Sequence, residues 1–452
     1  MQSMNPATEA VIRDYPEHSP EETDERLDFA RQTFDFWRRA SFEERGLLMA
    51  RAAQVLRKRK EELAALMTSE MGKVIVQAEA EVEKCAWVCD FYAERAEGFL
   101  SEEAVQTDAS RSYVRFDPLG PVLAVMPWNF PLWQVFRFAA PALMAGNVGL
   151  LKHASNVPGC ALAIEEVLRE AGFPKGAFQT LLIGSKAVEA VVRHPAVAAV
   201  TLTGSDPAGR SVAAAAGAAL KKTVLELGGS DPFVVLRDAD VPKAARTAAQ
   251  ARCINNGQSC IAAKRFIVEA PVYEAFEREF VKAMSGLAVG DPADRKTEVG
   301  PLARQDLMED LHDQVYRSLK AGAQLKCGGK RLPVRGFFYP PTVLSRVEPG
   351  MAAFEEETFG PVAALVLAED ADHAVALANA SPFGLGACLW TADLALAGRL
   401  AAEIESGSVF VNGMVKSDPR LPFGGVKLSG YGRELSAFGI REFVNVKTVW
   451  MA

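Results

Sequence analysis

The sequence predicts an α/β protein built from two doubly wound, Rossmann-like units with a cleft between them and a small β-extension. Its 452 residues exceed what one ordinary hydrophobic core holds. From about residue 119, short apolar runs alternate with helical stretches, which is typical of a parallel sheet covered on both faces. A second series of the same kind follows Glu226. Two units of similar architecture are therefore expected.

The N-terminal part differs from these two series in composition and in the spacing of its apolar residues. Residues 21–100 are rich in Glu, Lys, Arg, Ala and Leu, with apolar side chains at helical spacing, and they predict a series of long surface helices. Cys85 and Cys89 lie four residues apart within this pattern, with no second pair of ligands nearby. We therefore expect no metal site.

The two alternating series give the expected elements. In the first, helices are expected at 161–171 and 211–220, and strands at 122–125, 148–151, 181–183 and 197–202. In the second, helices are expected at 242–253, 271–286 and 394–405, and strands at 233–236, 265–268, 362–366, 386–390 and 408–411. Residues 442–450 alternate like a strand but stand outside both series. Because an exposed apolar strand is an aggregation hazard, we expect it to pair with another subunit.

Composition excludes several classes of partner. The formal net charge of −7 leaves no basic stripe for nucleic acid or for anionic lipid. No apolar run is long enough to cross a bilayer, and the first residues lack the features of a signal peptide. Seven scattered cysteines, an odd number, favour a reducing compartment, so a cytoplasmic protein is expected.

One thiol stands out. Cys260 follows the polar turn Asn-Asn-Gly-Gln-Ser at 255–259, and Glu226 precedes Leu-Gly-Gly upstream. Backbone N–H groups beside small residues can hold an oxyanion without blocking an incoming carbonyl, so the two residues are typical of a nucleophile and its base. The alternative is that Cys260 is a small core residue like most cysteines.

Two segments are candidates for binding a nucleotide. Gly204 and Ser205 follow an expected strand and open an expected helix, where backbone N–H groups can donate hydrogen bonds to a phosphate. The alternative is that Ser205 only caps the helix. Lys152, at the end of another strand and close to Ser155, is placed to hold ribose hydroxyls or a phosphate. It is equally interpretable as a solvated surface lysine.

Taken together, these segments resemble the aldehyde dehydrogenase superfamily, and the likeness covers nearly the entire chain. Seven motifs carry it in order, at 127–131, 151–155, 203–205, 226–229, 257–260, 356–361 and 422–430. Chance supplies one or two such matches but not the full series. The resemblance implies that 1–107 and 119–227 form a cofactor-binding domain and 228–411 a catalytic domain. It further implies oligomerisation segments at 108–118 and 436–452, a return of 412–435 to the cofactor domain, and a homodimer or homotetramer.

The resemblance also implies catalytic roles. Cys260 would attack the aldehyde carbon, and the Asn129 amide with the backbone N–H of Cys260 would hold the oxyanion of the thiohemiacetal. After hydride loss, Glu226 would activate water to hydrolyse the thioester. A relative that passes the acyl group to coenzyme A is the alternative reaction, and a catalytically silent binding protein with the same fold is the alternative class. Glu226 favours hydrolysis.

NADP or NAD is the implied cofactor, and no metal is implied. NAD-selective relatives often carry an acidic residue where this chain has Ser155, and a serine does not repel a 2′-phosphate, so NADP is expected to be accepted. The implied contacts are Lys152 on the adenosine ribose, Gly204 and Ser205 at the pyrophosphate, Glu357 on the nicotinamide ribose, and Trp128 and Phe359 beside the nicotinamide.

The finer likeness is to bacterial-type succinate-semialdehyde dehydrogenases, at 152–157, 225–233 and 430–436. Arg137 matches a carboxylate-binding arginine of that group, although it is also interpretable as a helix-surface arginine. Ile254 stands where some members have a second arginine, which leaves glutarate semialdehyde and uncharged aldehydes open as substrates. Ser417, or alternatively Arg420, is expected to complete the carboxylate anchor.

Overall fold

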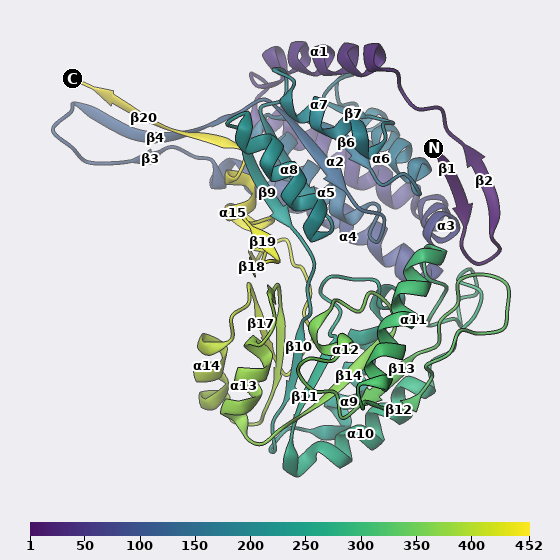
Figure 1. The fold of residues 1–452 in the computed structure, drawn as a ribbon. Coiled ribbons are helices and arrows are strands. Elements are labelled where there is room, and N and C mark those ends of the chain that lie inside the picture. Colours follow the sequence, from purple (N-terminus) through teal and green to yellow (C-terminus); the bar gives the residue numbers. More distant parts are fainter.

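The computed structural model describes all 452 residues and contains two units of helices around a sheet, with a protruding arm (Figure 1). The first unit has a six-stranded sheet in the order β19-β9-β8-β5-β6-β7. Its strands are parallel except β19, which pairs antiparallel with β9. The bounds are β5 (Pro121–Met126), β6 (Val148–His153), β7 (Phe178–Thr180), β8 (Ala199–Thr203), β9 (Lys222–Glu226) and β19 (Gly430–Tyr431).

Helices surround this sheet, and local signals set where several of them begin. The side chains of Ser19 and Ser41 each accept a hydrogen bond from the backbone N–H three residues on, at Glu22 and Glu44. The carboxylates of these two glutamates in turn accept from the backbone N–H groups of Ser19 and Ser41. These capping boxes stabilise the first turns of α1 and α2. The bounds are α1 (Pro20–Trp37), α2 (Phe42–Lys58), α3 (Lys60–Met71), α4 (Ile75–Phe99), α5 (Trp133–Ala145), α6 (Pro158–Glu170), η1 (Ser185–Ala187), α7 (Val188–Arg193) and α8 (Asp206–Ala218).

The second unit has a seven-stranded sheet in the order β12-β13-β14-β11-β10-β16-β17, parallel except for the edge strand β12. Phe233 and Val235 of β10 pack into one hydrophobic core and Val234 into another, because alternate side chains leave opposite faces. The strands are β10 (Pro232–Val235), β11 (Arg265–Glu269), β12 (Gln324–Cys327), β13 (Thr342–Ser345), β14 (Val362–Ala368), β16 (Ala387–Trp390) and β17 (Val409–Val411). The helices are α9 (Val241–Cys253), η2 (Ile254–Gly257), α10 (Ala270–Ser285), α11 (Gln305–Lys320), α12 (Ala352–Glu355), α13 (Ala371–Asn379) and α14 (Leu394–Glu403).

The arm is a three-stranded antiparallel sheet in the order β20-β4-β3 (Figure 1). The C-terminal strand β20 (Val444–Met451) pairs along its length with β4 (Arg111–Pro118) of the same chain, and β3 (Glu103–Ala104) adds to the other side of β4. The strand expected near the C-terminus therefore has a partner within its own chain. Its outer edge is free, and Val446 and Trp450 are exposed, so the expected pairing with another subunit stays a prediction.

Two expectations about local structure are wrong, and several elements were not expected. The strand expected at 181–183 lies three residues earlier, at β7, an edge strand whose Gln179 side chain donates to the backbone of Arg26. The N-terminal helices are not merely surface helices, since Met67, Cys85 and Cys89 are fully buried. Elements that were not expected include β9, β12, β13, α7, α11 and α12, and the short elements β1 (Gln2–Asn5), β2 (Ala10–Asp14), β15 (Phe383–Gly384), β18 (Val426–Lys427) and α15 (Ser436–Arg441).

None of the helices has both the length and the apolar character needed to cross a membrane. All seven cysteines are free thiols. Histidine, cysteine and carboxylate side chains nowhere gather in a group of three that could hold a metal ion.

Candidate active site

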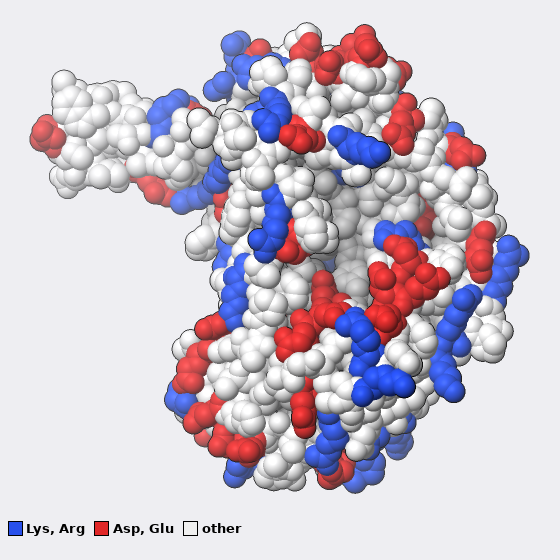
Figure 2. Space-filling model, viewed as in Figure 1, with Lys and Arg blue, Asp and Glu red and all other residues white.

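A cleft of about 350 Å³ lies where the two units meet, and Figure 2 shows the surface hollowed between them. Both units contribute to its lining, the first through the loops after β5 and β8, the second through Cys260 and the loop before β14. Seven of the predicted site residues line it: Trp128, Asn129, Gly204, Ser205, Cys260, Glu357 and Phe359.

A left-handed turn positions Cys260. Asn255, Asn256 and Gly257 have φ values of 53°, 58° and 78°, a conformation that asparagine and glycine tolerate best. A Cβ on Gly257 would lie 2.3 Å from the carbonyl carbon of Gly360, so only glycine fits there. Burial raises the pKa of the Cys260 thiol to about 12, against the positive charges of Arg137 and Lys264, which lower it. The thiol is therefore neutral at rest and needs a base when it attacks.

The side chain of Asn129 is held beside the nucleophile loop. Its Nδ2 donates to the carbonyl oxygen of Gln258 at 3.1 Å, and its Oδ1 accepts from Nε2 of Gln134 at 3.2 Å. The backbone oxygen of Asn129 accepts from Nδ2 of Asn255 at 2.6 Å. An amide nitrogen carries two hydrogens, so one N–H of Asn129 is free to donate to a ligand in the cleft.

Glu226 ends β9 and is buried behind the cleft, with 1% of its surface exposed. Neither carboxyl oxygen has a hydrogen-bond partner. Burial, followed by the nearby carboxyl of Glu434, raises the pKa of Glu226 to about 8. Its Oε1 would lie 2.9 Å from a Cβ at Gly424, so glycine in the 422–430 motif leaves room for this carboxyl. A carboxyl that has no hydrogen-bond partner and a pKa of about 8 is suited to act as a general base.

The residues expected to bind a nucleotide lie at the ends of β6 and β8. Ser205 occupies the N-cap position of α8, yet its side chain caps no backbone N–H. Its hydroxyl and the first N–H groups of α8 are therefore available to an anion. Lys152 is largely buried, which lowers its pKa, so it is not a solvated surface lysine. Lys152 and the exposed Ser155 lie outside the lining of the cleft itself.

Aromatic rings and a carboxylate form the opposite part of the cleft. Trp128 and Phe359 meet edge to face, with ring centroids 5.8 Å apart. Glu357 accepts a hydrogen bond from the backbone N–H of Gly229 at 3.0 Å and lies 3.5 Å from Nζ of Lys264. This carboxylate is partly exposed to the cleft. The two apolar rings and the carboxylate fit a nicotinamide ring and the hydroxyls of its ribose.

Arg137 is buried away from the lining of the cleft. It forms an ion pair with Glu434, its Nη2 lies 3.4 Å from Oγ1 of Thr203, and it stacks over the ring of Phe423. It is therefore not the helix-surface arginine of the alternative interpretation. Its charge nevertheless reaches Cys260, whose pKa it lowers. Carboxylate binding by Arg137 stays a prediction.

Ser417 has a cationic partner that the sequence did not reveal. Nζ of Lys84, on α4, donates to its Oγ at 2.7 Å and lies over the ring of Trp133. Burial and then the positive charge of Arg137 lower the pKa of Lys84 to about 8. Lys84 and Arg137 repel each other, and Lys84 contacts the Ser417 hydroxyl. An anion bound beside them would stabilise this arrangement. The alternative residue Arg420 is exposed and paired with Asp418.

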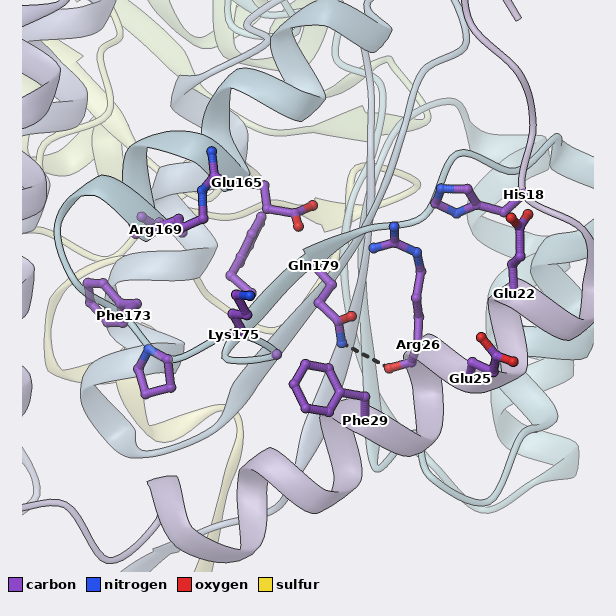
Figure 3. Close-up of a pocket in the computed structure, with 14 residues that line it drawn as sticks. His18, Glu22, Glu25, Arg26, Phe29, Glu165, Arg169, Phe173, Lys175 and Gln179 are labelled. Carbon is purple, nitrogen blue, oxygen red and sulfur yellow. Dashed lines mark hydrogen bonds between the residues drawn. The ribbon is translucent and has the colours of Figure 1, made fainter.

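A larger hollow of about 560 Å³ lies elsewhere, between α1 and α6 (Figure 3). Charged side chains of both signs line it, among them Arg26, Glu165 and Lys175. None of the predicted catalytic or cofactor-binding residues is among them. The smaller cleft is therefore the candidate active site, because it holds the reactive groups.

Comparison with known proteins agrees with this geometry. The model of the aldehyde dehydrogenase family matches residues 1–449. The chain belongs to the aldehyde dehydrogenase family. Among aldehyde dehydrogenases, it is 56% identical over 450 residues to a probable NADP(+) succinate-semialdehyde dehydrogenase of Synechocystis, covering 100% of this chain and 99% of the relative. It is 53% identical over 453 residues to NADP(+) succinate-semialdehyde dehydrogenase 1 of Mycobacterium tuberculosis, with coverage of 100% and 99%.

A solved aldehyde dehydrogenase structure gives the same fold. The crystal structure of succinic semialdehyde dehydrogenase from Streptococcus pyogenes in complex with NADP+ superposes with a TM-score of 0.97 at 36% identity, covering 100% of this chain and 99% of that chain. The predicted α/β fold with two Rossmann-like units is confirmed.

Four residues near this aldehyde dehydrogenase site escaped the sequence reasoning: Lys84, Lys264, Arg304 and Glu434. Glu434 lay inside a recognised motif without a role, and Lys264 directly before an expected buried strand is a signal that was available. Nothing in the local sequence marks Lys84 or Arg304. Only the fold brings Lys84 to Ser417 and Arg304 to the rim of the cleft, over Trp128.

Proposed function

We propose that the protein oxidises succinate semialdehyde to succinate and uses NADP as the hydride acceptor. The observation that carries the proposal is the convergence of Cys260 and Asn129 on one cleft, with the unheld carboxyl of Glu226 buried behind it. The named relatives support the choice of aldehyde and cofactor.

Cys260 forms the bond to the aldehyde carbon. Its thiol has a raised pKa, so the proton must leave as the sulfur attacks, and Glu226 is the nearby carboxyl whose pKa of about 8 suits it as acceptor. The oxygen of the resulting thiohemiacetal becomes negative. The free N–H of Asn129 and the backbone N–H of Cys260 are the donors that stabilise it.

NADP, when bound, supplies the hydride acceptor that turns the thiohemiacetal into a thioester. The groups that would hold it are the Ser205 hydroxyl with the α8 N-terminus, the Glu357 carboxylate, and the rings of Trp128 and Phe359. Lys152 and Ser155 would hold the adenosine ribose, where the neutral serine tolerates a 2′-phosphate.

Glu226 completes the cycle by activating water. After hydride transfer, Glu226 must first release to solvent the proton that it took from Cys260. Since no hydrogen bond fixes its carboxyl, the side chain can then turn toward the thioester on Cys260, take a proton from the attacking water and return it to the departing sulfur. The thiol then leaves and succinate is released. A buried base beside the acyl group favours water over coenzyme A as the acceptor.

The group of Lys84, Ser417 and Arg137 supports an anionic substrate. Arg137 is buried and Lys84 partly buried, and the charge of Arg137 lowers the pKa of both Lys84 and Cys260. A carboxylate at the far end of the aldehyde would relieve the repulsion between them. An uncharged aldehyde gains nothing from this group.

The test is a kinetic panel without coenzyme A. The purified protein is assayed with succinate semialdehyde, glutarate semialdehyde and butanal, each with NADP and with NAD. The proposal expects the highest kcat/KM for succinate semialdehyde with NADP. A strict requirement for coenzyme A, or an equal kcat/KM for butanal, would refute it.

A further inference from the structure

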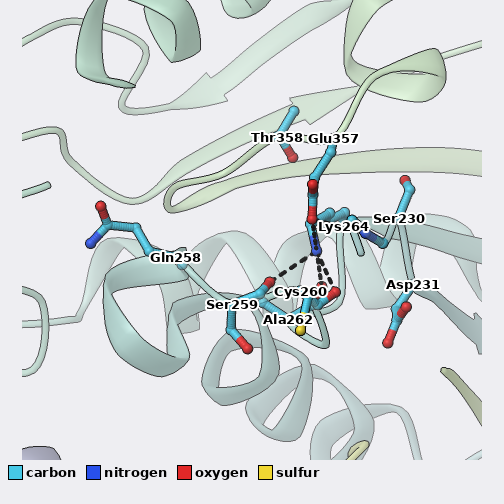
Figure 4. A network of polar contacts seen from close by, with 12 residues as sticks. Ser230, Asp231, Gln258, Ser259, Cys260, Ala262, Lys264, Glu357 and Thr358 are labelled. Atoms are coloured by element: carbon cyan, nitrogen blue, oxygen red, sulfur yellow. Dashed lines mark hydrogen bonds and ion pairs between the residues drawn. The ribbon is translucent and has the colours of Figure 1, made fainter. Parts of the chain in front are cut away.

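The ammonium group of Lys264 lies against the loop that carries Cys260, to which dashed lines join it in Figure 4. Its Nζ donates to three backbone carbonyl oxygens of this loop, those of Ser259 at 3.0 Å, Cys260 at 2.8 Å and Ala262 at 3.1 Å. The side chain is fully buried. All three N–H bonds of the ammonium are therefore spent on the loop that holds the nucleophile.

The base of this side chain is fixed to the sheet. Lys264 immediately precedes β11, its backbone N–H donates to the carbonyl oxygen of Asp231 at 3.0 Å, and its own carbonyl accepts from Ala364 at 3.0 Å. The ammonium is therefore carried by the rigid centre of the second unit. The loop is held by a group that does not move with it.

Because the peptide bond is planar, the contact of Lys264 with the Ser259 carbonyl also fixes the direction of the Cys260 N–H, which belongs to the expected oxyanion site. The carbonyl of Ser259 and the N–H of Cys260 belong to one trans peptide group and point in opposite directions. Because Lys264 holds the carbonyl, the N–H of Cys260 points away from Lys264. A positive charge on the carbonyl also polarises the peptide group and strengthens its N–H as a donor.

The charge of Lys264 is only partly balanced. The carboxylate of Glu357 lies 3.5 Å from its Nζ and also accepts from the N–H of Gly229. The other ionisable groups that face the ammonium are Asp231, Arg252 and Cys260. Asp231 is buried, and burial raises its pKa to about 7, so it is a weak counter-charge near neutral pH. Burial lowers the pKa of Lys264, and the charge of Glu357 opposes that shift. The positive charge of Lys264 in turn lowers the pKa of Cys260.

We propose that Lys264 is a positioning residue that orients and polarises the Ser259–Cys260 peptide group and stabilises the anionic forms of Cys260. The inference rests on the proposed role of Cys260 as nucleophile. A purely structural lysine would only satisfy the loop carbonyls, and a neutral donor would serve as well. The two roles differ in whether the charge matters.

The test uses alkylation of Cys260 by iodoacetamide in the full-length protein without aldehyde or cofactor. The rate is followed against pH by mass spectrometry of the Cys260 peptide, and the midpoint of the profile is compared between variants. Lys264→Met should raise the midpoint by about one pH unit or more, because the thiolate loses its cation. Lys264→Arg keeps the charge and should stay near the wild type. Glu357→Gln removes a negative charge and should shift the midpoint in the opposite direction.

Arg252→Met is the matched control. Arg252 is also a buried cation that holds a carbonyl of this segment, donating to Gly257 at 2.6 Å, but its charge is not among the largest contributions to the pKa of Cys260. Its loss should loosen the segment and leave the alkylation midpoint unchanged. In steady-state oxidation, Lys264→Met should lower kcat by about 10²-fold with a smaller change in KM.

A wild-type midpoint in Lys264→Met, or the same shift in Arg252→Met, would overturn the proposal. If Lys264→Met does not fold, the downward shift in Glu357→Gln carries the test, and an unchanged midpoint there would overturn it. Alkylation requires neither aldehyde nor NADP. A failure to oxidise succinate semialdehyde would therefore refute the proposed function without deciding the role of Lys264.

Discussion

Arg137 and Glu434 form an ion pair in the interior of the protein, with side chains only 3% and 6% exposed. The pair lies next to Glu226, whose pKa is raised by Glu434 and lowered by Arg137. The arginine thus belongs to the electrostatic surroundings of the base as well as to the expected carboxylate anchor.

Breaking this pair should destabilise the protein. Arg137→Met leaves a buried carboxylate without its cation, which costs about 3–5 kcal/mol. Thermal unfolding should show a clear fall in melting temperature, and the double variant Arg137→Met with Glu434→Gln should recover part of it. Arg193→Met, which breaks an exposed pair, is the control. A loss no larger than that of the control would contradict the account of a buried pair.

Lys84 should select for a charged substrate. We expect Lys84→Met to raise the KM for succinate semialdehyde by about ten- to a hundredfold, since a hydrogen bond to a charged group contributes about 1.5–3 kcal/mol. The KM for butanal should hardly change. Lys416→Met removes an equal charge from the exposed residue next to Ser417 and should alter neither value. Equal effects of Lys84→Met on both aldehydes would remove Lys84 from the substrate anchor.

Ser155 should set the tolerance for a 2′-phosphate. In Ser155→Glu, a carboxylate would face the phosphate of NADP, and a repulsion of about 2 kcal/mol corresponds to about a thirtyfold loss of kcat/KM with NADP. NAD should lose far less or improve. Steady-state kinetics with both cofactors measures the ratio, and Ser155→Ala controls for the lost hydroxyl. An unchanged ratio in Ser155→Glu would place the 2′-phosphate elsewhere.

The pH dependence of turnover should report Glu226. Its pKa of about 8 means that the carboxylate, the form that accepts protons, is gained as pH rises through that value. We expect kcat to increase toward a plateau above about pH 8 and to fall by about 10²- to 10⁴-fold in Glu226→Gln. The same pKa predicts a pH dependence of stability. Because the pKa of Glu226 is higher in the folded protein than in the unfolded chain, the protonated carboxyl stabilises the fold at low pH, and this contribution is lost as pH rises through about 8. As pH rises to about 8, Glu226→Gln should therefore lose less unfolding free energy than the wild type.

Much of the fold could be predicted because the determining signals are local. Strands such as β5, β10 and β14 are continuous apolar runs between Gly or Pro turns, and buried parallel strands are of this kind. The edge strand β7 was misplaced because its Phe-Gln-Thr sequence is less apolar than the run that follows it. The arm was recognised by its alternation, but the pairing of β20 with β4 joins segments more than 300 residues apart in the sequence, and no local signal encodes it.

Some residues of the site could likewise be predicted from local motifs, and others could not. Cys260, Asn129 and Glu226 each lie in a short continuous motif, and the residue types in these motifs indicate their chemical roles. Lys84 and Ser417 are 333 residues apart and meet only in the folded protein. The environment of Arg137 was equally hidden, since a buried carboxylate partner is a property of packing. Interactions between ionisable groups that are distant in the sequence can therefore be identified only from the structure.

The central claim is that Cys260 carries the acyl group and Glu226 releases it to water. The most direct measurement mixes Glu226→Gln with succinate semialdehyde and NADP, follows NADPH release on the first turnover, and identifies the modified peptide by mass spectrometry. The account predicts that NADPH release by Glu226→Gln stops at one equivalent of enzyme, and that it is slower than the first turnover of the wild type because Cys260 has lost its proton acceptor. It also predicts a succinyl thioester on Cys260 and no NADPH release by Cys260→Ala. Sustained turnover by Glu226→Gln, or an acyl group on any other residue, would contradict it.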